Sequence, residues 1–435
     1  MPSSTLTAPG PATSAPDRAA RLVQRFRALR DFSARLCRGL QPEDFVVQSM
    51  PDVSPTKWHL AHTTWFFETF VVKVWMKGYR SEVPEYAYLF NSYYNAAGTM
   101  HRRDLRGLIS RPTVQETLRY RASIDECVIK LVEGADEALL AELEPIVILG
   151  IQHEQQHQEL LITDIKHVFA QNPLHPVFEA RDQTAAQIQV PPQCFVEFDA
   201  ATVEIGHEGS EFSYDNEGPR HRALVGPFAL ANRLVTNGEY LAFLEAGGYT
   251  RSEFWLSLGW TTVQEQRWEA PLYWERQDGA WWNFTLSGFR PVDAAEPVTH
   301  LSYFEADAYA NWDGARLPTE FEWEHASAGL PIDGNFVDSQ RFHPAPVPDE
   351  GDARLQQMFG DTWEWTRSAY LPYPGYRAVA GALGEYNGKF MCNQMVLRGG
   401  SCATSQNHLR ATYRNFFQPE KRWQFTGLRL ARDLT

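Results

Sequence analysis

The sequence has 435 residues, with 54 acidic and 40 basic side chains and a formal net charge of −14. This charge argues against nucleic acid or an anionic membrane as the main partner, because both are bound by clusters of Lys and Arg. At roughly 100–200 residues per domain, the length predicts two or three domains. A content of 43% hydrophobic and 22% charged residues is typical of a folded globular protein.

The cysteines and the N-terminus indicate a cellular compartment. Five cysteines are scattered without a Cys-x-x-Cys pair, which is poor material for a disulfide framework and fits a reducing environment. Residues 1–17 are rich in Pro, Ser, Thr and Ala, and they predict a disordered leader rather than a signal peptide. No stretch offers the roughly 18 apolar residues that a membrane span needs. We therefore expect a cytoplasmic protein.

Apolar residues at helical spacing dominate the N-terminal part of the chain. They predict amphipathic helices over residues 21–40, 54–75, 113–133 and from near Pro145 to residue 169. The second helix is expected to begin with Ser54 as its N-cap and Pro55 as its first residue. Thr113 and Glu116 have the spacing of a capping box for the third helix. These helices predict a four-helix bundle over residues 18–171.

The pattern changes after residue 171. Residues 172–193 are rich in Pro, Gln and Ala, as is typical of a connector. Over residues 194–435, short β-type runs alternate with long stretches rich in Gly, Trp, Tyr and Pro, and helices are predicted only near 237–246 and 303–312. The sequence therefore predicts an α+β protein in which a helical bundle is followed by a loop-rich domain.

The strongest chemical motif is His153-Glu154-Gln155-Gln156-His157, on the fourth predicted helix. Residues four apart share one face of a helix, so both imidazoles can reach one metal ion. Glu154 makes the segment match the His-Glu-x-x-His pattern of zinc proteases, although we do not interpret it as a protease motif. Glu159 is expected to act as an outer carboxylate for a ligand imidazole.

A catalytic metal needs at least a third ligand. The second predicted helix offers His59 and His62, one turn apart. Three histidines from two helices would leave coordination positions open for substrate and oxygen, and imidazoles suit iron, zinc, copper or nickel. The spacing does not choose between His59 and His62, and either can instead pack in the core.

A polar loop after the second helix contains Tyr93 and Tyr94, followed by Arg102 and Arg103. Near an oxygen-activating metal a phenol can donate a proton or a hydrogen atom, and an Arg can bind a carboxylate through two hydrogen bonds. Adjacent tyrosines in a polar loop are often only packing residues. The loop is therefore a candidate site only in combination with the metal ligands.

The second half contains motifs of Trp, Arg and Glu that predict a structural framework: RLPTEFEWE (316–324), GDTWEWT (360–366), LRGGS (397–401) and TGLRLARD (426–433). They closely resemble the sulfatase-modifying-factor fold, a C-type-lectin-like domain of the formylglycine-generating-enzyme type. The first half resembles the DinB-like metal-binding bundle. Joined in this order, with HEQQHQELL, LFNSYYN and RNFFQPEKRWQFTGLRLARD, the motifs resemble the ergothioneine-biosynthesis sulfoxide synthases over almost the whole chain.

This resemblance implies a mononuclear non-haem iron(II) enzyme. Such enzymes use O2 to join a thiol to C2 of the imidazole of Nα-trimethylhistidine (hercynine) and oxidise the sulfur to a sulfoxide. The resemblance implies His62, His153 and His157 as the iron ligands, and it thereby selects His62 over His59. It also implies a proton donor, for which we expect Tyr93 or Tyr94. In one branch of the family this tyrosine comes from the C-terminal domain, so the open alternatives are Tyr376 and Tyr386.

The resemblance also assigns substrate-binding residues. Gln156 and Asn415 match positions that bind the hercynine imidazole, and Phe416 is a candidate wall for its trimethylammonium group. Where an Asp of the actinobacterial branch helps to hold γ-glutamylcysteine, this chain has Phe417, which favours cysteine as the thiol. Candidate partners for the carboxylate of the thiol substrate are Arg102, Arg103 and Lys421.

Rival functions come from relatives of the same fold. Ovothiol-type synthases usually carry a C-terminal methyltransferase domain, and this chain ends soon after Leu430, which favours the ergothioneine interpretation. A relative that uses a selenosugar remains an alternative, as does γ-glutamylcysteine as the thiol. A formylglycine-generating enzyme would need a cysteine pair near the terminal Arg-rich strand, which segment 409–414 lacks. We expect only small-molecule partners and a separate lyase that acts on the product.

Overall fold

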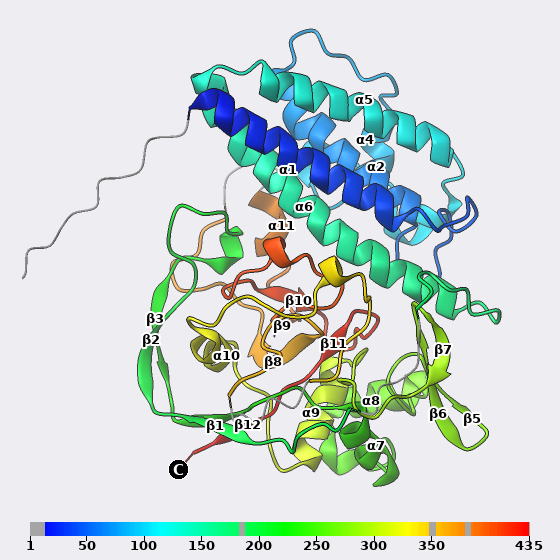
Figure 1. Ribbon diagram of the computed structural model, residues 1–435, viewed down its shortest axis with the longest axis vertical. Coiled ribbons are helices and arrows are strands. Elements are labelled where there is room, and N and C mark those ends of the chain that lie inside the picture. The colour runs from blue at the N-terminus through cyan, green and yellow to red at the C-terminus, as the bar shows by residue number, and fades with distance from the viewer. Residues whose placement is uncertain (1–13, 182–187, 348–353, 379–383, 435) are drawn as a thin grey trace, which may run out of the picture.

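The computed structural model describes residues 14–181, 188–347, 354–378 and 384–434, without the side chains of Glu385 and Tyr386. It confirms the α+β class: a helical domain lies above a domain of short strands and long loops in Figure 1. The expected leader falls mostly outside the described residues. Within the described ranges, no helix is long and apolar enough to cross a membrane.

The helical domain is built around a bundle of long helices, as predicted. Its helices are α1 (Ala15–Leu36), α2 (Thr56–Phe67), α3 (Lys73–Trp75), α4 (Tyr86–Phe90), α5 (Val114–Glu133) and α6 (Glu137–Ala170). The capping box of Thr113 and Glu116 forms at the start of α5. A π-helical turn, Glu68–Val72, joins α2 to α3, so the second predicted helix does reach Trp75.

Three predicted helix starts are wrong. The first helix, α1, begins at Ala15, before residue 21 and inside the expected leader. Ser54 does not cap α2, because its hydroxyl accepts a hydrogen bond from Arg106 and the N-cap position belongs to Pro55.

The helix α6 begins at Glu137 rather than near Pro145, which lies inside it. Asp136 caps α6 through the backbone N–H of Leu139, so the capping residue determines where this helix begins, and the helix accommodates the proline.

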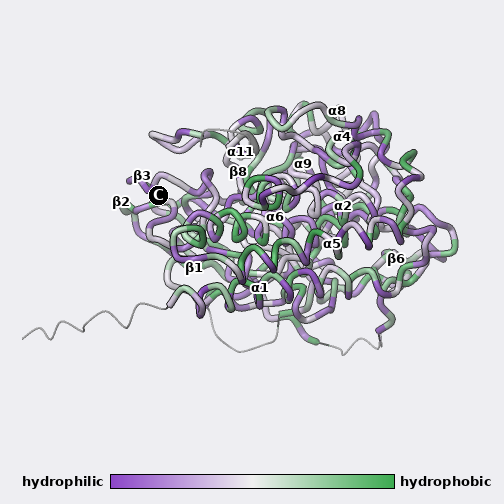
Figure 2. The backbone as a smooth tube through the Cα atoms, turned by 90° about the horizontal axis from the view of Figure 1, so that it is seen from above, coloured by the Kyte–Doolittle hydropathy of each residue, from purple (hydrophilic) through white to green (hydrophobic). Residues whose placement is uncertain are grey.

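Apolar side chains from the bundle helices form one core. It includes Leu22 and Phe26 of α1, Trp65 of α2, Val128 of α5 and Val147 of α6. Every residue of α2 is buried, which makes α2 the central helix, whereas hydrophobic and hydrophilic segments alternate along α1 in Figure 2. This amphipathic pattern follows from one face of α1 packing on the bundle and the other facing solvent.

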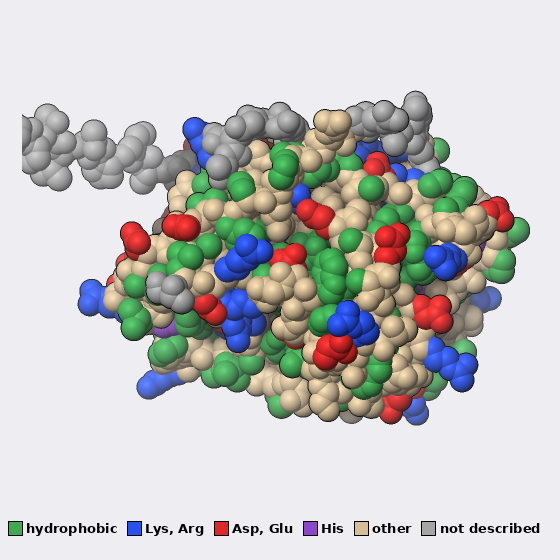
Figure 3. Space-filling view, turned by 90° about the horizontal axis from the view of Figure 1, so that it is seen from below, with side chains coloured by type: hydrophobic (Ala, Val, Ile, Leu, Met, Phe, Trp, Pro, Cys, Tyr) green, Lys and Arg blue, Asp and Glu red, His purple; other side chains and the backbone are tan. Residues whose placement is uncertain are grey.

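The C-terminal domain contains several small sheets. Its strands are β1 (Phe195–Phe198), β2 (Ala201–Ile205), β3 (His221–Val225), β4 (Phe228–Ala231), β5 (Trp274–Gln277), β6 (Ala280–Thr285), β7 (Gly288–Pro291), β8 (Trp363–Ala369), β9 (Met395–Arg398), β10 (Asn415–Phe417), β11 (Thr426–Gly427) and β12 (Ala431–Asp433). The sheets have the orders β1-β4-β12, β10-β9-β8-β11, β2-β3 and β5-β6-β7. Pairing is antiparallel except between β11 and β8. On the face seen in Figure 3, charged side chains of both signs are interspersed.

This domain has more helical segments than the sequence predicts. They are α7 (Asn237–Glu245), α8 (Ser257–Gln266), α9 (Tyr303–Trp312), α10 (Glu320–Ser327) and α11 (Glu385–Gly388). The predictions near 237–246 and 303–312 are confirmed by α7 and α9, whereas α8 and α10 were not predicted. The helix α10 begins within the RLPTEFEWE motif, with a capping box between Thr319 and Glu322, and extends past it to Ser327.

The Trp, Arg and Glu motifs form a buried framework, as expected. Arg429 forms an ion pair with Glu364 at 2.9 Å, and the indole of Trp323 donates to the same carboxylate. Arg398 pairs with Glu324 at 2.6 Å. Each guanidinium is fully buried, so its carboxylate partner is needed to compensate for the lost hydration. These contacts hold β8 and β9 and the C-terminal strands in place.

The helix α6 joins the two domains. It runs along the side of the bundle that faces the C-terminal domain (Figure 1). Leu161 and Ile165 of α6 share an apolar core with Phe284, Phe342 and Phe425 of the C-terminal domain. The same helix carries His153 and His157, so the metal-ligand candidates lie next to the domain junction.

Candidate metal centre

Two helices of the bundle bring three histidines together. His62 lies on α2, and His153 and His157 lie about one turn apart on α6. One nitrogen of each imidazole lies within 4.8 Å of the others, and Nε2 of His62 is 3.2 Å from Nε2 of His153. The four-residue spacing on α6 places both of its imidazoles on one helical face. These are the three residues expected from the resemblance.

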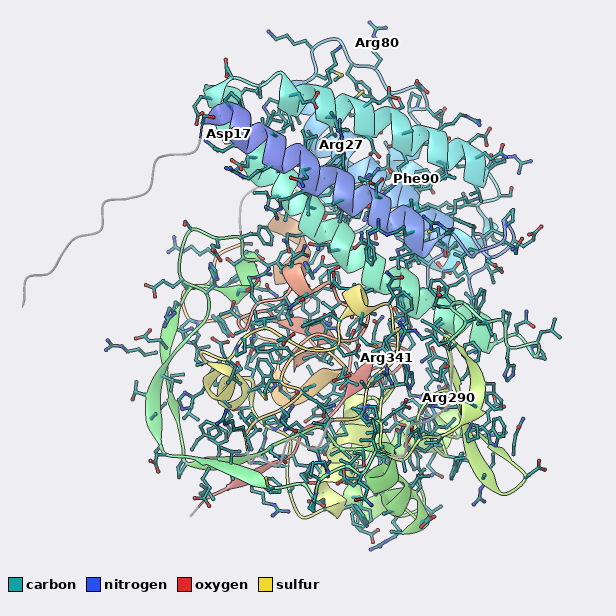
Figure 4. All side chains as sticks on the ribbon, viewed as in Figure 1. Asp17, Arg27, Arg80, Phe90, Arg290 and Arg341 are labelled. Atoms are coloured by element: carbon teal, nitrogen blue, oxygen red, sulfur yellow. The ribbon has the colours of Figure 1, made fainter. Side chains whose placement is uncertain are left out.

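Their surroundings favour the neutral form of the three imidazoles. Burial lowers the pKa of His153 to about 4, and burial with the neighbouring imidazoles holds the pKa values of His62 and His157 well below the usual range. Nδ1 of His62 donates to the carbonyl of Phe90 at 2.6 Å, so its lone pair lies on Nε2. Phe90 ends α4 within the helical domain (Figure 4). Neutral imidazoles gathered in this way fit a first-row transition metal.

His59, the alternative that the sequence left open, has other contacts. Its Nδ1 lies 2.9 Å from Nδ1 of His157, and its Nε2 lies 3.0 Å from Oδ2 of Asp164. Its two nitrogens therefore face these neighbours and not the other two histidines. Within the described residues, the cluster that can hold a metal is His62, His153 and His157.

A cavity lies beside the three histidines, between the two domains. Most of the expected site residues line it: Tyr93, Tyr94, Arg103, Gln156, Asn415 and Phe416. Its walls come from α2, α6, the loop after α4 and the β10 segment of the C-terminal domain. A substrate in this cavity would therefore contact both domains and the histidine cluster at once.

The two tyrosines occupy different environments in the cavity wall. Tyr94 is buried among Trp65, Phe70 and His153, with its ring centroid 6.3 Å from that of His153. Tyr93 has a positive φ of 63° and accepts a hydrogen bond from Arg103. A positive φ is uncommon for a bulky residue, and here it accompanies a loop that turns both rings into the cavity wall. Both tyrosines thus line the same cavity as the histidines.

Gln156 is held by a residue that the sequence did not identify. Its amide nitrogen donates to Oη of Tyr413 at 2.8 Å, and Oη of Tyr413 lies 3.1 Å from Nε2 of His408. Nδ1 of His408 lies 2.6 Å from the amide oxygen of Gln152. This buried chain of hydrogen bonds links α6 to the C-terminal domain. It fixes the Gln156 amide nitrogen toward Tyr413 and leaves its oxygen as an acceptor.

The strand β10 supplies an apolar wall. Phe416 stacks on Tyr370, with centroids 4.1 Å apart, and lies 5.8 Å from Phe390. Phe417 packs edge-on against Trp423 at 5.5 Å. Asn415 begins the strand and lines the cavity with them. The position that the resemblance associates with an acidic residue is therefore part of an aromatic cluster.

Basic residues lie at another part of the cavity. Arg103 donates to the backbone carbonyl of Asp52 as well as to Tyr93. Lys421 forms an ion pair with the Asp52 carboxylate at 2.7 Å. Asp52 lines the cavity, and Lys421 is connected to it only through this ion pair. Arg102 does not join them, because it is exposed and pairs with Asp104 at 2.5 Å. Of the three expected basic residues, only Arg103 therefore lines the cavity.

Arg106 is a further cavity residue that the sequence analysis missed. Its guanidinium lies 3.4 Å above the ring of Trp58, which itself stacks on His62 at 4.6 Å. It donates to the hydroxyls of Ser54 and Ser92, and burial lowers its pKa to about 9. Arg106 follows Arg103 by three residues on the same short helical segment. This spacing is the feature of the sequence that could have identified it.

Two glutamates of α6 have structural partners. Burial alone would raise the pKa of Glu154, but its ion pairs with Arg121 and Arg30 lower it to about 2. It therefore points into the bundle core, and the protease interpretation does not apply. The outer-carboxylate role expected for Glu159 is wrong, because its oxygens accept from Trp363, Ser401 and Thr404 of the C-terminal domain.

The structure describes the side chain of only one of the two alternative tyrosines, Tyr376. Tyr376 donates to Asp215 at 2.8 Å and is not among the residues that line the cavity. Tyr386 belongs to α11, and its side chain is outside the described residues.

Comparisons with known proteins follow this domain division. The model of the sulfatase-modifying factor enzyme 1-like domain matches residues 179–351 and 338–434, and that of the DinB superfamily matches residues 25–161. The chain is 40% identical over 243 residues to the hercynine oxygenase of Mycobacterium tuberculosis, covering 51% of this chain and 56% of that one. The chain thus spans about half the length of this relative.

Two further relatives are named for ergothioneine biosynthesis and for formylglycine generation. The ergothioneine biosynthesis protein 1 of Schizosaccharomyces pombe is 28% identical over 244 residues, which cover 52% of this chain and 29% of that protein. The formylglycine-generating enzyme of Thermomonospora curvata is 29% identical over 276 residues, which cover 52% of this chain and 89% of that enzyme. The matched domain accounts for more than half of the chain. The protein therefore belongs to the family defined by the sulfatase-modifying factor enzyme 1-like domain, here preceded by a domain of the DinB superfamily.

Proposed function

We propose that the protein is an iron(II)- and O2-dependent enzyme that joins the thiol of cysteine to C2 of the hercynine imidazole, giving hercynyl-cysteine sulfoxide in ergothioneine biosynthesis. In the balanced reaction the C2–H bond, the S–H bond and O2 are consumed. A C–S bond and an S–O bond form, and the second oxygen atom leaves as water with the two hydrogens. Carbon and sulfur supply the four electrons that reduce O2.

The observation that carries this proposal is the position of three neutral histidines at the wall of an interdomain cavity. Three imidazoles leave half of an octahedral coordination sphere for other ligands. The names of the similar proteins, hercynine oxygenase and ergothioneine biosynthesis protein 1, support hercynine as the substrate.

His62, His153 and His157 would hold the iron ion. When bound, iron(II) supplies the activation of O2 and lowers the pKa of a coordinated thiol. Tyr94 or Tyr93 would hold a proton close to the reacting atoms, because both line the cavity that contains the histidines. We favour Tyr94, which lies against the ring of His153, whereas Tyr93 is engaged with Arg103.

Hercynine has an imidazole, a carboxylate and a trimethylammonium group, and the cavity offers a partner for each. The amide oxygen of Gln156 can accept from the imidazole N–H, because the amide nitrogen is engaged with Tyr413. Asn415 lies on the opposite wall and would orient the same ring. The trimethylammonium group would pack against Phe416 and Phe390, as quaternary ammonium groups do on aromatic rings.

The thiol substrate is proposed to be free cysteine. Arg103 would bind its carboxylate, with Lys421 as a second cation linked to the cavity through Asp52. Phe417 packs on Trp423 and offers no acidic group for the ammonium of a γ-glutamyl moiety. Because the product still carries the cysteine skeleton on a C–S bond, a separate lyase must cleave that bond.

The proposal is tested with the iron-reconstituted chain, hercynine and either cysteine or γ-glutamylcysteine, with the products identified by mass spectrometry. We expect the sulfoxide of hercynyl-cysteine from cysteine, and turnover with γ-glutamylcysteine at least about tenfold lower. Preference for γ-glutamylcysteine would overturn the choice of thiol and keep the reaction. Turnover of histidine in place of hercynine would favour an ovothiol-type synthase, and a product formed only with a selenosugar would favour that relative.

A further inference from the structure

A chain of hydrogen bonds leads from His157 away from the histidine cluster. Nδ1 of His157 lies 2.9 Å from Nδ1 of His59, and Nε2 of His59 lies 3.0 Å from Oδ2 of Asp164. His59 and Asp164 are each 3% exposed. Both are therefore shielded from water, and their hydrogen bonds must be satisfied within the protein.

The surroundings of Asp164 determine its role in this chain. Besides His59, it accepts hydrogen bonds from the backbone N–H of Ser54 at 2.8 Å and from the indole N–H of Trp423 at 3.1 Å. Both of these groups can only donate. A carboxylate surrounded by such donors acts as an acceptor, so His59 must direct an N–H toward it. Nε2 of His59 therefore carries the hydrogen.

This assignment fixes the tautomer of the next imidazole. When His59 carries a single hydrogen, on Nε2, it has a lone pair on Nδ1 that faces Nδ1 of His157. Two lone pairs 2.9 Å apart would repel each other, so His157 carries its hydrogen on Nδ1 and donates it to His59. Its own lone pair then lies on Nε2, the nitrogen that a metal ion needs.

We propose that His59 and Asp164 are positioning residues that select the metal-binding tautomer of His157 and fix the orientation of its ring. The inference deepens the proposed function, since it concerns the same metal site. It also explains why His59 is not itself a ligand. The hydrogen bond from His62 to the Phe90 carbonyl does the same for His62, whereas Nδ1 of His153 has no hydrogen-bond partner among the described residues.

The series of hydrogen bonds from His157 to Asp164 also involves both domains. Trp423, which donates to Asp164, belongs to the C-terminal domain, whereas the histidines belong to the bundle. The outer support of the metal site is therefore completed only when the domains are in contact. Removal of such outer partners typically weakens metal binding by about 10- to 100-fold.

The first test measures cobalt(II) affinity and the visible spectrum of the cobalt-loaded full chain. In His59→Leu the acceptor for His157 is lost, and we expect affinity to fall by about 10- to 100-fold with an altered spectrum. In His59→Asn the amide oxygen can replace Nδ1 as acceptor, so most of the affinity should return. His167→Leu is the control, because His167 is a buried histidine of α6 that bonds to Ser49 and takes no part in the hydrogen bonds from His157 to Asp164.

The second measurement needs no variant. In the zinc-loaded wild-type chain with 15N-labelled histidine, NMR should show His59 protonated at Nε2, and His157 protonated at Nδ1 and bound through Nε2. His59 protonated at Nδ1, or unchanged cobalt affinity in His59→Leu, would overturn the inference. A wild-type chain that binds neither metal would overturn the metal site with it. Because neither measurement uses a substrate, a failure of the proposed reaction would leave both results interpretable.

Discussion

Nε2 of His62 and Nε2 of His153 lie 3.2 Å apart, although 91 residues separate them in the chain. With Nδ1 of His62 donating to the Phe90 carbonyl, its lone pair points at the other imidazole. When His153 also has its lone pair on Nε2, a cation between the two nitrogens would stabilise the pair. This geometry supports the proposed metal site, with His157 as the third candidate ligand.

Loss of His62 should remove metal-dependent stabilisation. An ion that binds only the folded state stabilises it by about 4 kcal/mol at a thousandfold excess over its dissociation constant. We expect iron(II) or cobalt(II) to raise the thermal midpoint of the wild-type chain and to leave that of His62→Ala unchanged. Differential scanning fluorimetry with and without metal measures both. An equal rise in the variant would show that the metal binds elsewhere.

Substitution of the tyrosines should alter the product and preserve binding. Tyr94→Phe removes a hydroxyl and keeps the ring that packs against Trp65 and Phe70. If Tyr94 holds the reactive proton, sulfoxide formation should fall by at least about tenfold, with more thioether or disulfide side product. Tyr93→Phe is the matched variant from the same loop. Unchanged product ratios in both would exclude these tyrosines, and a larger effect for Tyr93→Phe would reverse their roles.

Glu154 should be needed for stability and not for chemistry. It is paired with Arg30 and Arg121 in the bundle core, and removal of one partner of a buried ion pair costs about 3–5 kcal/mol. We expect Glu154→Gln to lower the free energy of unfolding by about this amount in chemical denaturation. Turnover per folded, metal-loaded molecule should stay within about twofold. A complete loss of turnover in folded protein would instead support a general-base role.

Glu154 should also contribute to acid denaturation. Its pKa is held at about 2 in the folded state, well below the value of about 4.3 for a free glutamate. Its stabilising contribution is therefore complete above about pH 5 and is lost as the pH falls toward 2. The difference in unfolding free energy between wild type and Glu154→Gln should shrink over this range. A constant difference between pH 7 and pH 3 would contradict the ion-pair account.

A buried lysine at the domain junction should give a pH dependence of the same sign in the alkaline range. Nζ of Lys166 lies 2.6 Å from Nε2 of His300, and burial lowers the pKa of Lys166 to about 7. Between pH 7 and about 10 the unfolded chain holds this proton and the folded chain does not, so the contribution of Lys166 to stability rises with pH. Relative to Lys166→Met, wild type should gain roughly 1 kcal/mol per pH unit between pH 7 and 9. Denaturant titrations at these two values measure it, and parallel curves would contradict it.

Much of the fold could be predicted because it depends on local signals. Apolar periodicity located the bundle helices, and the Thr113 capping box marked the start of α5. Pro145 gave a wrong start for α6, because the cap at Asp136 and buried Leu140 and Leu143 extend the helix past it. The helix α10 was missed because it is short and begins in a motif whose buried Glu and Trp serve the framework.

The candidate site was less accessible to prediction where it depends on distant contacts. The four-residue spacing identified His153 and His157, but the choice of His62 came from the resemblance. Asp164 supports His59 across 105 positions of sequence, and Tyr413 holds Gln156 across 257. No periodicity connects such pairs, so the outer support of the site emerges only from the packed domains. For the same reason the sequence suggested Glu159 as the outer carboxylate of the metal site, a role that we propose for Asp164.

We propose that the three-histidine site uses O2 to couple hercynine with cysteine. The most direct measurement reconstitutes the chain anaerobically with iron(II), adds hercynine, cysteine and 18O2, and follows O2 consumption and product mass. We expect iron-dependent uptake of one O2 per product, and hercynyl-cysteine sulfoxide carrying one 18O atom. His62→Ala should form none. Absence of O2 uptake by the metal-loaded wild type, or a coupled product without oxygen from O2, would contradict the account.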